Sequence, residues 1–302
     1  MRTVVRACVL LVLLALAPAC TASDDGRPQI VVTTNILGDL TRAVVGDTAA
    51  VTVLMPPNAD PHQFAISAQT AARIERADLL VHNGLGLEEG VRRHIGSAEQ
   101  AGVPAVAVGE LVDPIRYRNA DANGPDPHFW TDPRRVRRAV EILGERVAGI
   151  DGVDAAAVRA NTSRYLAEVD RLDAWMGERF ATIPPERRKL VTNHHVFGYL
   201  AARFGFEVIG AVIPGGTTLA SPSASDLAGL ADTIRAVGVP AVFADSSQPD
   251  RLARVLAEQA GLHVRVIALY SESLTEPGGG APTYPDMMRA NTEAIVGGLT
   301  AP

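Results

Sequence analysis

The sequence predicts an α/β protein with two lobes, each built on a mostly parallel sheet, joined by one long helix. Apolar, β-branched runs alternate with helical segments from residue 29 onward, a pattern typical of parallel strands covered by helices on both faces. Between residues 132 and 180 this alternation stops, and the periodicity is helical throughout. The chain has 302 residues, 47% of them hydrophobic and 21% charged, which suits two domains of ordinary globular composition.

The first residues are typical of an export signal. Two arginines precede an apolar run at residues 9–17, which is too short to span a bilayer as a permanent helix. We expect a signal peptide at residues 1–19 and a polar tether at residues 20–28. Cleavage before Cys20 gives a cell-surface lipoprotein, and ordinary cleavage after Ala19 gives a periplasmic protein. The polar tether directly after Cys20 favours the lipoprotein, and both cleavages predict export.

The cysteine count and the net charge exclude several kinds of site and partner. The chain has two cysteines, and Cys8 lies inside the predicted signal. The mature domain therefore has no internal disulfide and no thiolate metal ligand, so nitrogen and oxygen must hold any metal. The net charge is −6, so the sequence gives no sign of a basic surface that would attract nucleic acid. We expect a monomer with no nucleic-acid partner.

The first lobe is expected at residues 29–152. Ser67 is placed to cap a helix, because its hydroxyl can accept from the first free backbone N–H groups. Strands are predicted at residues 30–34, 50–55, 79–81 and 103–108, and helices at residues 36–45 and 67–76.

Two helices without an intervening strand follow. Pro133 is suited to the first turn of the first helix, and Asp151-Gly152 ends it. The second helix is predicted from about Asp154 to Phe180, within a linking segment at residues 153–183. At 1.5 Å per residue it spans roughly 40 Å, enough to tie two lobes together.

Strand–helix alternation then resumes in a second lobe at residues 184–302. Strands are predicted at residues 189–192, 207–212, 241–244 and 264–269, and helices at residues 195–204, 223–236, 249–260 and 287–299.

Four metal-type side chains lie in loops after or beside strand-like runs: His62, His128, His194 and Glu272. In open α/β sheets, ligands gather beyond the carboxyl ends of the strands. The four positions are spread over most of the chain, so only folding can bring them into one shared cleft. Three imidazoles and one carboxylate make a complete tetrahedral set for Zn²⁺.

Four segments in order resemble the signature segments of the zinc/manganese solute-binding proteins of ABC importers (cluster A-I, also called cluster 9). They are Pro-His-Gln-Phe at 61–64, Asp-Pro-His-Phe-Trp-Thr-Asp-Pro at 126–133, His-His-Val-Phe-Gly-Tyr at 194–199 and Leu-Tyr-Ser-Glu-Ser-Leu at 269–274. The resemblance covers residues 30–299, and the predicted long helix separates the second segment from the third.

The resemblance implies two α/β lobes joined by one rigid helix, with metal held in the cleft between them. It implies that His62, His128 and His194 are nitrogen ligands. The fourth family ligand is usually Asp, and here Glu272 occupies that position; we expect a small shift of residues 277–282 to accommodate its extra methylene. The His-rich stretch that many zinc-specific members carry near residues 113–126 is absent from this sequence.

Several neighbours compete for these roles. His195 is the fallback for His194, although we expect it to enter the following helix and point elsewhere. Asp245, at another strand end, competes with Glu272. Asp60 and Asp126 are candidate acceptors for the ring N–H groups of the ligands, and the alternative is that they are simply loop-turn residues. The other residues are Trp130, expected as a wall of the cleft, and His82, His94 and His263, expected to be ordinary histidines.

The function predicted is extracytoplasmic capture of a divalent metal ion for delivery to the membrane permease of an ABC importer, with no catalysis. Zinc is preferred because three imidazoles suit it, whereas manganese sites favour oxygen. A manganese-binding member of the same family is the alternative. A further alternative is a zinc hydrolase or lyase with water as the fourth metal ligand. A surface adhesin is a third possibility, and it is compatible with metal capture. A lipid anchor on Cys20 would hold the protein at the membrane.

Overall fold

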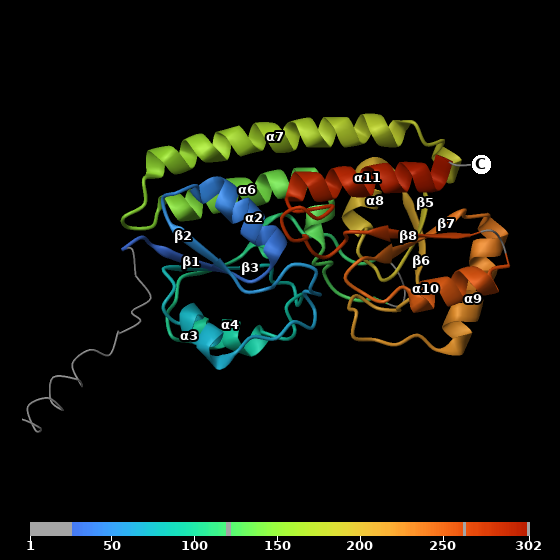
Figure 1. Cartoon of the computed structure of the whole chain (residues 1–302), viewed down its shortest axis with the longest axis horizontal. Coiled ribbons are helices and arrows are strands. Elements are labelled where there is room, and N and C mark those ends of the chain that lie inside the picture. The colour runs from blue at the N-terminus through green and yellow to red at the C-terminus, as the bar shows by residue number, and fades with distance from the viewer. Residues whose placement is uncertain (1–25, 119–121, 262–263, 301–302) are drawn as a thin grey trace, which may run out of the picture.

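Two parallel four-stranded sheets organise the chain, one in each lobe (Figure 1). The first sheet has the strand order β2-β1-β3-β4, and the second has the order β6-β5-β7-β8, so the two lobes repeat one topology. The computed structural model describes residues 26–118, 122–261 and 264–300, which leaves the predicted signal peptide and Cys20 outside the described residues. The strands are β1 (Gln29–Val32), β2 (Ala50–Val53), β3 (Leu79–His82), β4 (Ala105–Ala107), β5 (Lys189–Thr192), β6 (Glu207–Ala211), β7 (Ala241–Asp245) and β8 (Arg265–Leu269).

Helices cover both sheets, and short polar side chains begin several of them. Thr34, Ser67, Asp132, Asp154 and Ser223 each accept a backbone N–H in the first turn of the helix that follows, as N-caps do. The helices are α2 (Asn35–Val45), α3 (Ala68–Ile74), α4 (Arg92–Gln100), α5 (Val108–Leu111), α6 (Pro133–Ala148), α7 (Ala155–Ala181), α8 (Gly198–Phe204), α9 (Ala224–Val237), α10 (Arg251–Gln259) and α11 (Tyr284–Thr300), with 3₁₀ turns at Phe129–Thr131 and Pro185–Arg187.

Helix α7 links the two lobes along one side of the molecule (Figure 1). Its 27 residues span roughly 40 Å. It packs on α2 and α6 of the first lobe and on α11 of the second. Val158 and Leu172 of α7 belong to one apolar core that also contains Ile30 of the first sheet and Phe243 of the second. This shared core fixes the lobes to each other on the α7 side.

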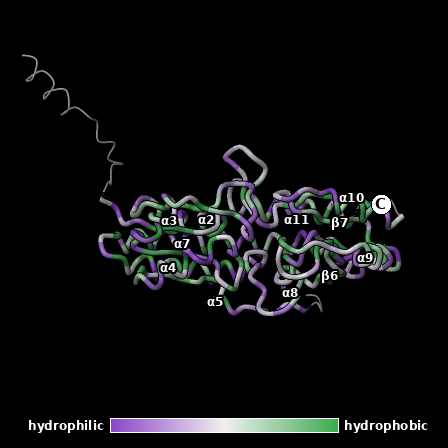
Figure 2. Tube along the Cα trace, turned by 90° about the horizontal axis from the view of Figure 1, so that it is seen from below, coloured by the Kyte–Doolittle hydropathy of each residue, from purple (hydrophilic) through white to green (hydrophobic). Residues whose placement is uncertain are grey.

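Each sheet also has an apolar cluster of its own on the opposite face. Successive residues of a strand point to opposite faces, and β1 shows this directly: Ile30 and Val32 enter the shared core, whereas Val31 enters the cluster of the first lobe. In the second lobe, Val191 and Val242 belong to a separate cluster under α9 and α10. Hydrophobic positions accordingly follow the interior segments of both lobes (Figure 2).

The predicted elements agree with the structure except in a few places. Helix α8 begins at Gly198 rather than at residue 195, because Val196 N donates to His194 O at 2.9 Å and turns the chain before the helix. Helix α4 was not predicted, since among its residues only Ile95 and Ala98 are buried. The strands of the two sheets fall inside residues 29–152 and 184–302, while the lobe boundaries themselves stay a prediction.

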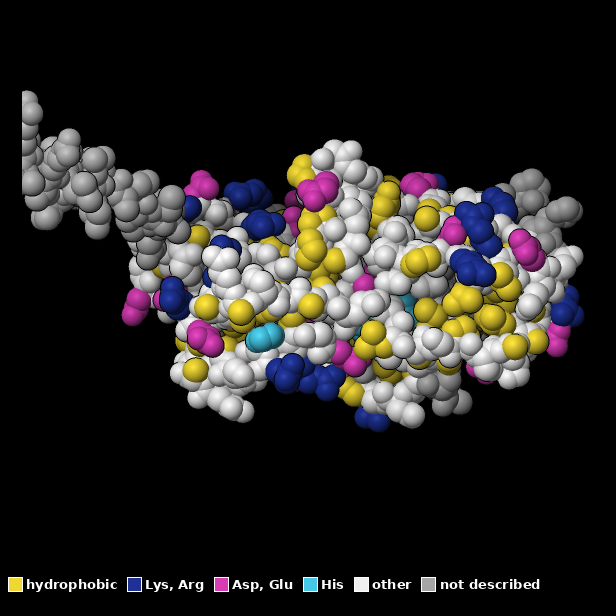
Figure 3. Space-filling model, turned by 60° about the horizontal axis from the view of Figure 1, so that its bottom comes forward, with side chains coloured by type: hydrophobic (Ala, Val, Ile, Leu, Met, Phe, Trp, Pro, Cys, Tyr) yellow, Lys and Arg dark blue, Asp and Glu magenta, His cyan; other side chains and the backbone are white. Residues whose placement is uncertain are grey.

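The described part of the chain contains no helix with the length and hydropathy needed to cross a membrane. On the face shown in Figure 3, basic and acidic side chains are interspersed.

Candidate metal centre

The four predicted ligands come from four different loops, two in each lobe. His62 follows β2, and His128 directly precedes the 3₁₀ turn that leads into α6. His194 follows β5, and Glu272 follows β8. Loops at the carboxyl ends of parallel strands meet at one edge of a sheet, and here the edges of the two sheets face each other. This arrangement brings together four residues that are widely separated in the sequence.

The side chains converge tightly. One ligand atom from each of His62, His128, His194 and Glu272 lies within 4.8 Å of the others. Glu272 Oε2 is 3.3 Å from His62 Nε2, and Glu272 Oε1 is 3.4 Å from both His128 Nε2 and His194 Nε2. The Nε2 atoms of His62 and His128 are 3.4 Å apart. All four side chains are buried, with at most 1% of their surface exposed.

These separations suit a small cation at the centre. With bonds of about 2.0–2.1 Å, the donors of a tetrahedral zinc site lie roughly 3.3–3.4 Å from one another, the length of the tetrahedron's edge. Among the described residues, neither oxygen of Glu272 and neither ring nitrogen of His194 has a hydrogen-bond partner. Buried polar atoms without partners are costly, and a bound cation removes that cost.

Asp126 sets the orientation of the His128 ring. Its Oδ1 atom lies 2.7 Å from His128 Nδ1 and accepts the backbone N–H of His128 at 3.0 Å. An Nδ1–H that donates to a carboxylate leaves the Nε2 lone pair directed at the site. A Cβ at position 198 would lie 2.5 Å from Asp126 Oδ2, so Gly198 allows this approach. The predicted role of Asp126 as a ring acceptor is confirmed.

Asp60 contacts the backbone of His62 and not its ring. It accepts the backbone N–H of His62 at 2.8 Å, not a ring N–H, and His62 Nδ1 has no partner among the described residues. Its other oxygen accepts from Gln63 Nε2 at 2.6 Å and from two side chains of the second lobe, Thr218 and Gln248. Of the two interpretations of Asp60, the ring acceptor is therefore wrong, and the bond to the backbone two residues on agrees with the loop-turn residue.

The charged groups of the site shift one another's pKa values. Burial raises the pKa of Glu272, but attraction to His194 and His62 outweighs it and holds that pKa well below its usual range. Burial lowers the pKa of His62, and Glu272 more than reverses this, so the pKa of His62 lies above its ordinary value. For His128, burial outweighs the effect of Asp126 and lowers the pKa. A carboxylate that stays ionised and an imidazole that resists protonation both suit metal binding.

The backbone on both sides of Glu272 is held in place. Trp130 Nε1 donates to Ser271 O at 2.8 Å, and the Trp130 ring lies 5.3 Å from the His128 ring, as expected for a wall of the site. On the other side, Leu274 N donates to Asn35 Oδ1 at 3.0 Å. Glu272 thus reaches the three imidazoles from a pinned backbone position.

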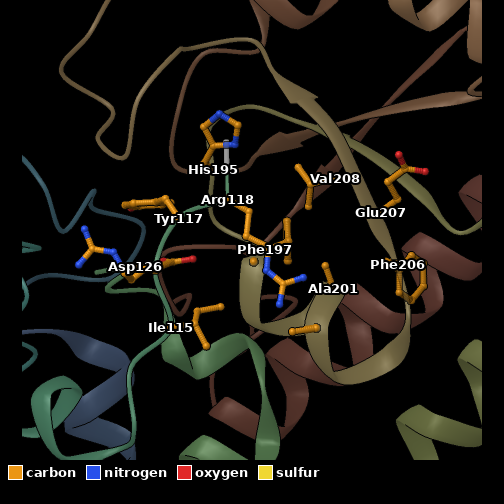
Figure 4. Close-up of a pocket in the computed structure, with 13 residues that line it drawn as sticks. Ile115, Tyr117, Arg118, Asp126, His195, Phe197, Ala201, Phe206, Glu207 and Val208 are labelled. Atoms are coloured by element: carbon orange, nitrogen blue, oxygen red, sulfur yellow. The ribbon is translucent and has the colours of Figure 1, made fainter. Parts of the chain in front are cut away.

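The competing residues lie outside this cluster. Asp245 accepts from Ser247 N at 2.7 Å and from the hydroxyls of Ser247 and Ser271, so its oxygens are occupied. Burial, followed by the charge of Glu272, raises the pKa of Asp245. His195 is buried beside the cluster and instead lines a separate pocket of about 280 Å³ together with Asp126 and Phe197 (Figure 4). His263 lies outside the described residues.

Sequence reasoning missed Tyr117 of the first lobe and Gly216 of the second, which meet beside His128. Tyr117 donates its hydroxyl to Gly216 O at 3.1 Å and lies 3.5 Å from His128 Nδ1. A Cβ at Gly216 would lie 2.5 Å from the Tyr117 hydroxyl, so a glycine is required for this contact. The Gly-Gly-Thr-Thr run at 215–218 was the available signal, because close backbone approach commonly requires glycine.

Comparison with known proteins gives a consistent result. The family described as zinc-uptake complex component A, periplasmic, matches residues 30–298. The zinc-binding protein TroA of Treponema pallidum is 32% identical over 285 residues, covering 92% of this chain and 91% of TroA. The manganese-binding lipoprotein MntA of Halalkalibacterium halodurans is 27% identical over 306 residues, covering 99% of this chain and all of MntA.

Solved structures show the same architecture. The structure of the periplasmic zinc-binding protein TroA from Treponema pallidum superposes with a TM-score of 0.84 at 29% identity, covering 91% of this chain and 100% of the other. A Mn-bound periplasmic metal-binding protein from Candidatus Liberibacter asiaticus gives 0.80 at 26% identity, covering 90% and 100%.

Proposed function

The chain belongs to the family of zinc-uptake complex component A periplasmic proteins, and on this premise we propose that its cargo is zinc, held by His62, His128, His194 and Glu272. It is an exported metal-binding component of an ABC importer, and it is not an enzyme. Its partner is accordingly the membrane permease of such an importer. The relatives are named for different metals: manganese, zinc and iron. The choice of zinc therefore rests on the side chains that this chain offers as ligands.

One observation carries the proposal: the carboxylate of the buried Glu272 lies 3.3–3.4 Å from a nitrogen of each of three buried imidazoles, and the four ligand atoms all lie within 4.8 Å of one another. The Nε2 lone pair of His128, directed inward by Asp126, meets an ionised carboxylate. Acceptors in such contact repel each other unless a cation lies between them. Three nitrogens and one carboxylate favour zinc, since manganese prefers a set richer in oxygen.

Manganese is the second candidate because both oxygens of Glu272 face the imidazoles, Oε2 toward His62 and Oε1 toward His128 and His194. A carboxylate that binds through both oxygens raises the coordination number above four. The oxygens of Asp245, which would be the next acidic donor, are already taken by serine groups. This weakens the case for an oxygen-rich manganese site.

A competition titration with a chromogenic chelator tests the choice of metal. We expect one Zn²⁺ per chain and a lower Kd for Zn²⁺ than for Mn²⁺. Tighter binding of Mn²⁺ would overturn the assignment of zinc while leaving metal capture in place. A stoichiometry that His128→Ala does not change would show that the metal binds elsewhere.

We further propose that Cys20 carries a lipid and that the protein acts as a monomer. The support for the anchor is the polar tether after Cys20 together with lipoprotein relatives of similar length. Metabolic labelling with a radioactive fatty acid is expected to mark the wild-type protein and not a Cys20→Ser variant. Equal labelling of both would exclude this anchor, and sedimentation analysis of the mature protein tests the monomer.

A further inference from the structure

We propose that Asp60 is a clamp between the lobes, which closes the outer side of the metal site and slows release of the ion. This inference rests on the proposed function. Asp60 is a positioning residue, since it acts on the site through the loop that carries His62 and through two loops of the second lobe. Its carboxylate is buried, with 6% of the residue surface exposed.

The hydrogen bonds of Asp60 connect three loops at a single carboxylate. Oδ1 accepts the backbone N–H of the ligand His62 at 2.8 Å. Oδ2 accepts from Thr218 Oγ1 at 2.6 Å, in the loop between β6 and α9, and from Gln248 Nε2 at 2.7 Å, in the loop between β7 and α10. Gln63 Nε2, in the loop of Asp60 itself, donates to the same oxygen at 2.6 Å. Movement of either lobe relative to the other therefore pulls directly on the ligand loop.

The hydrogen bonds between the lobes fall into two groups. One group involves residues of the shared apolar core, for example Trp130 with Ser271 at 2.8 Å, the hydroxyl of Tyr199 with Asp126 O at 2.8 Å, and the hydroxyl of Tyr284 with Trp130 O at 3.0 Å. These bonds lie within the core that includes α7, so breaking them also exposes apolar surface. The second group joins residues that are not members of that core, and it includes Asp60 with its two partners, Tyr117 with Gly216, and Asn35 with Ser273.

Release of the ion requires movement, because at most 1% of each ligand side chain is exposed. Local opening proceeds where few apolar contacts must be broken. The second group of bonds satisfies that condition, whereas the first group does not. A buried carboxylate that accepts four hydrogen bonds is the strongest element of this second group, because bonds to a charged acceptor are stronger than neutral ones. Asp60 should therefore control the rate of opening.

The test measures the dissociation rate of Zn²⁺ by stopped-flow mixing of the loaded protein with excess chelator. Thr218→Val removes one cross-lobe donor while preserving side-chain shape, and we expect about tenfold faster dissociation. Asp60→Asn should accelerate dissociation about 10- to 100-fold. The association rate should be unchanged or higher in both variants, since an opened clamp does not hinder binding. Thr217→Val is the matched control: Thr217 lies in the same loop, its hydroxyl accepts Leu219 N within that loop, and the wild-type rate is expected.

A double-mutant cycle separates a clamp from a purely local role. If Asp60 acts across the lobes, Asp60→Asn combined with Thr218→Val should be no faster than Asp60→Asn alone. Dissociation from Thr218→Val at the wild-type rate, with zinc bound normally, overturns the clamp and leaves the proposed function intact. Slower association in the variants would show a distorted site and also overturns it. A wild-type protein that binds neither Zn²⁺ nor Mn²⁺ overturns the proposed function and the clamp together.

Discussion

Replacing Glu272 by glutamine tests whether an anionic ligand closes the metal site. The change preserves the shape of the side chain and removes its charge. Glu272 is 1% exposed, and its oxygens lie 3.3 Å from His62 and 3.4 Å from His128 and His194. Loss of one member of a buried charged group costs about 3–5 kcal/mol. At 1.4 kcal/mol per factor of ten, zinc affinity should fall by about two to three and a half orders of magnitude.

The assay is equilibrium competition with a chelator of known affinity at neutral pH. Glu272→Asp preserves the charge but shortens the side chain by about 1.5 Å, one carbon–carbon bond. Hydrogen bonds to Trp130 and Asn35 fix the backbone on both sides, so we expect this variant to bind zinc with intermediate affinity. Glu276→Gln, an exposed position in the same loop, is the control and should match the wild type.

One result would refute this reasoning. If Glu272→Gln binds zinc as tightly as the wild type, the carboxylate does not ligate the metal, whatever its distance from the imidazoles. A water molecule or Asp245 would then be the fourth ligand, and Asp245→Asn would decide between these two. Loss of zinc binding together with loss of the folded circular-dichroism signal would instead identify Glu272 as a structural residue.

Three further predictions concern the histidines. His194→Ala should abolish tight zinc binding. The far-UV circular dichroism of the metal-free protein should stay unchanged, because His194 belongs to none of the apolar clusters. An unfolded variant would contradict the role of His194 as a ligand. Asp126→Asn should lower the affinity for zinc about 10- to 100-fold, because the His128 ring loses the acceptor that fixes its tautomer. NMR of that ring should report the changed tautomer. Zinc affinity should fall as the pH falls through the raised pKa of His62. Below that pKa the protonated ring pairs with Glu272 and stabilises the metal-free form, and above it this stabilisation is lost. Zinc occupancy that stays complete at pH values where carboxylates titrate would exclude a site that depends on His62.

The sequence by itself determined the layout of the molecule. Strand–helix alternation is interrupted once, by a helical stretch, and the structure has two parallel sheets joined by α7. Periodicity is a local property, so the residues of each element carry it. Helix caps are equally local, and Ser67 and Asp154 begin α3 and α7 for that reason. Helix α4 escaped prediction because a mostly exposed helix has too few apolar residues to display a period.

The sequence also indicated which side chains converge, because their loops lie after or beside strands and their order resembles a known family. It offered two aspartates, Asp60 and Asp126, as acceptors for the rings, and could not indicate which of them holds one. Whether Asp60 or Asp126 holds a ring depends on a difference of a few ångströms in loop geometry, and only the folded chain decides that Asp126 contacts a ring while Asp60 crosses to Thr218. These partners are 158 residues apart in the sequence, and no local pattern records such a contact. Tertiary structure decides it, because a hydrogen bond forms only where packing of both lobes places a donor within about 3 Å of an acceptor.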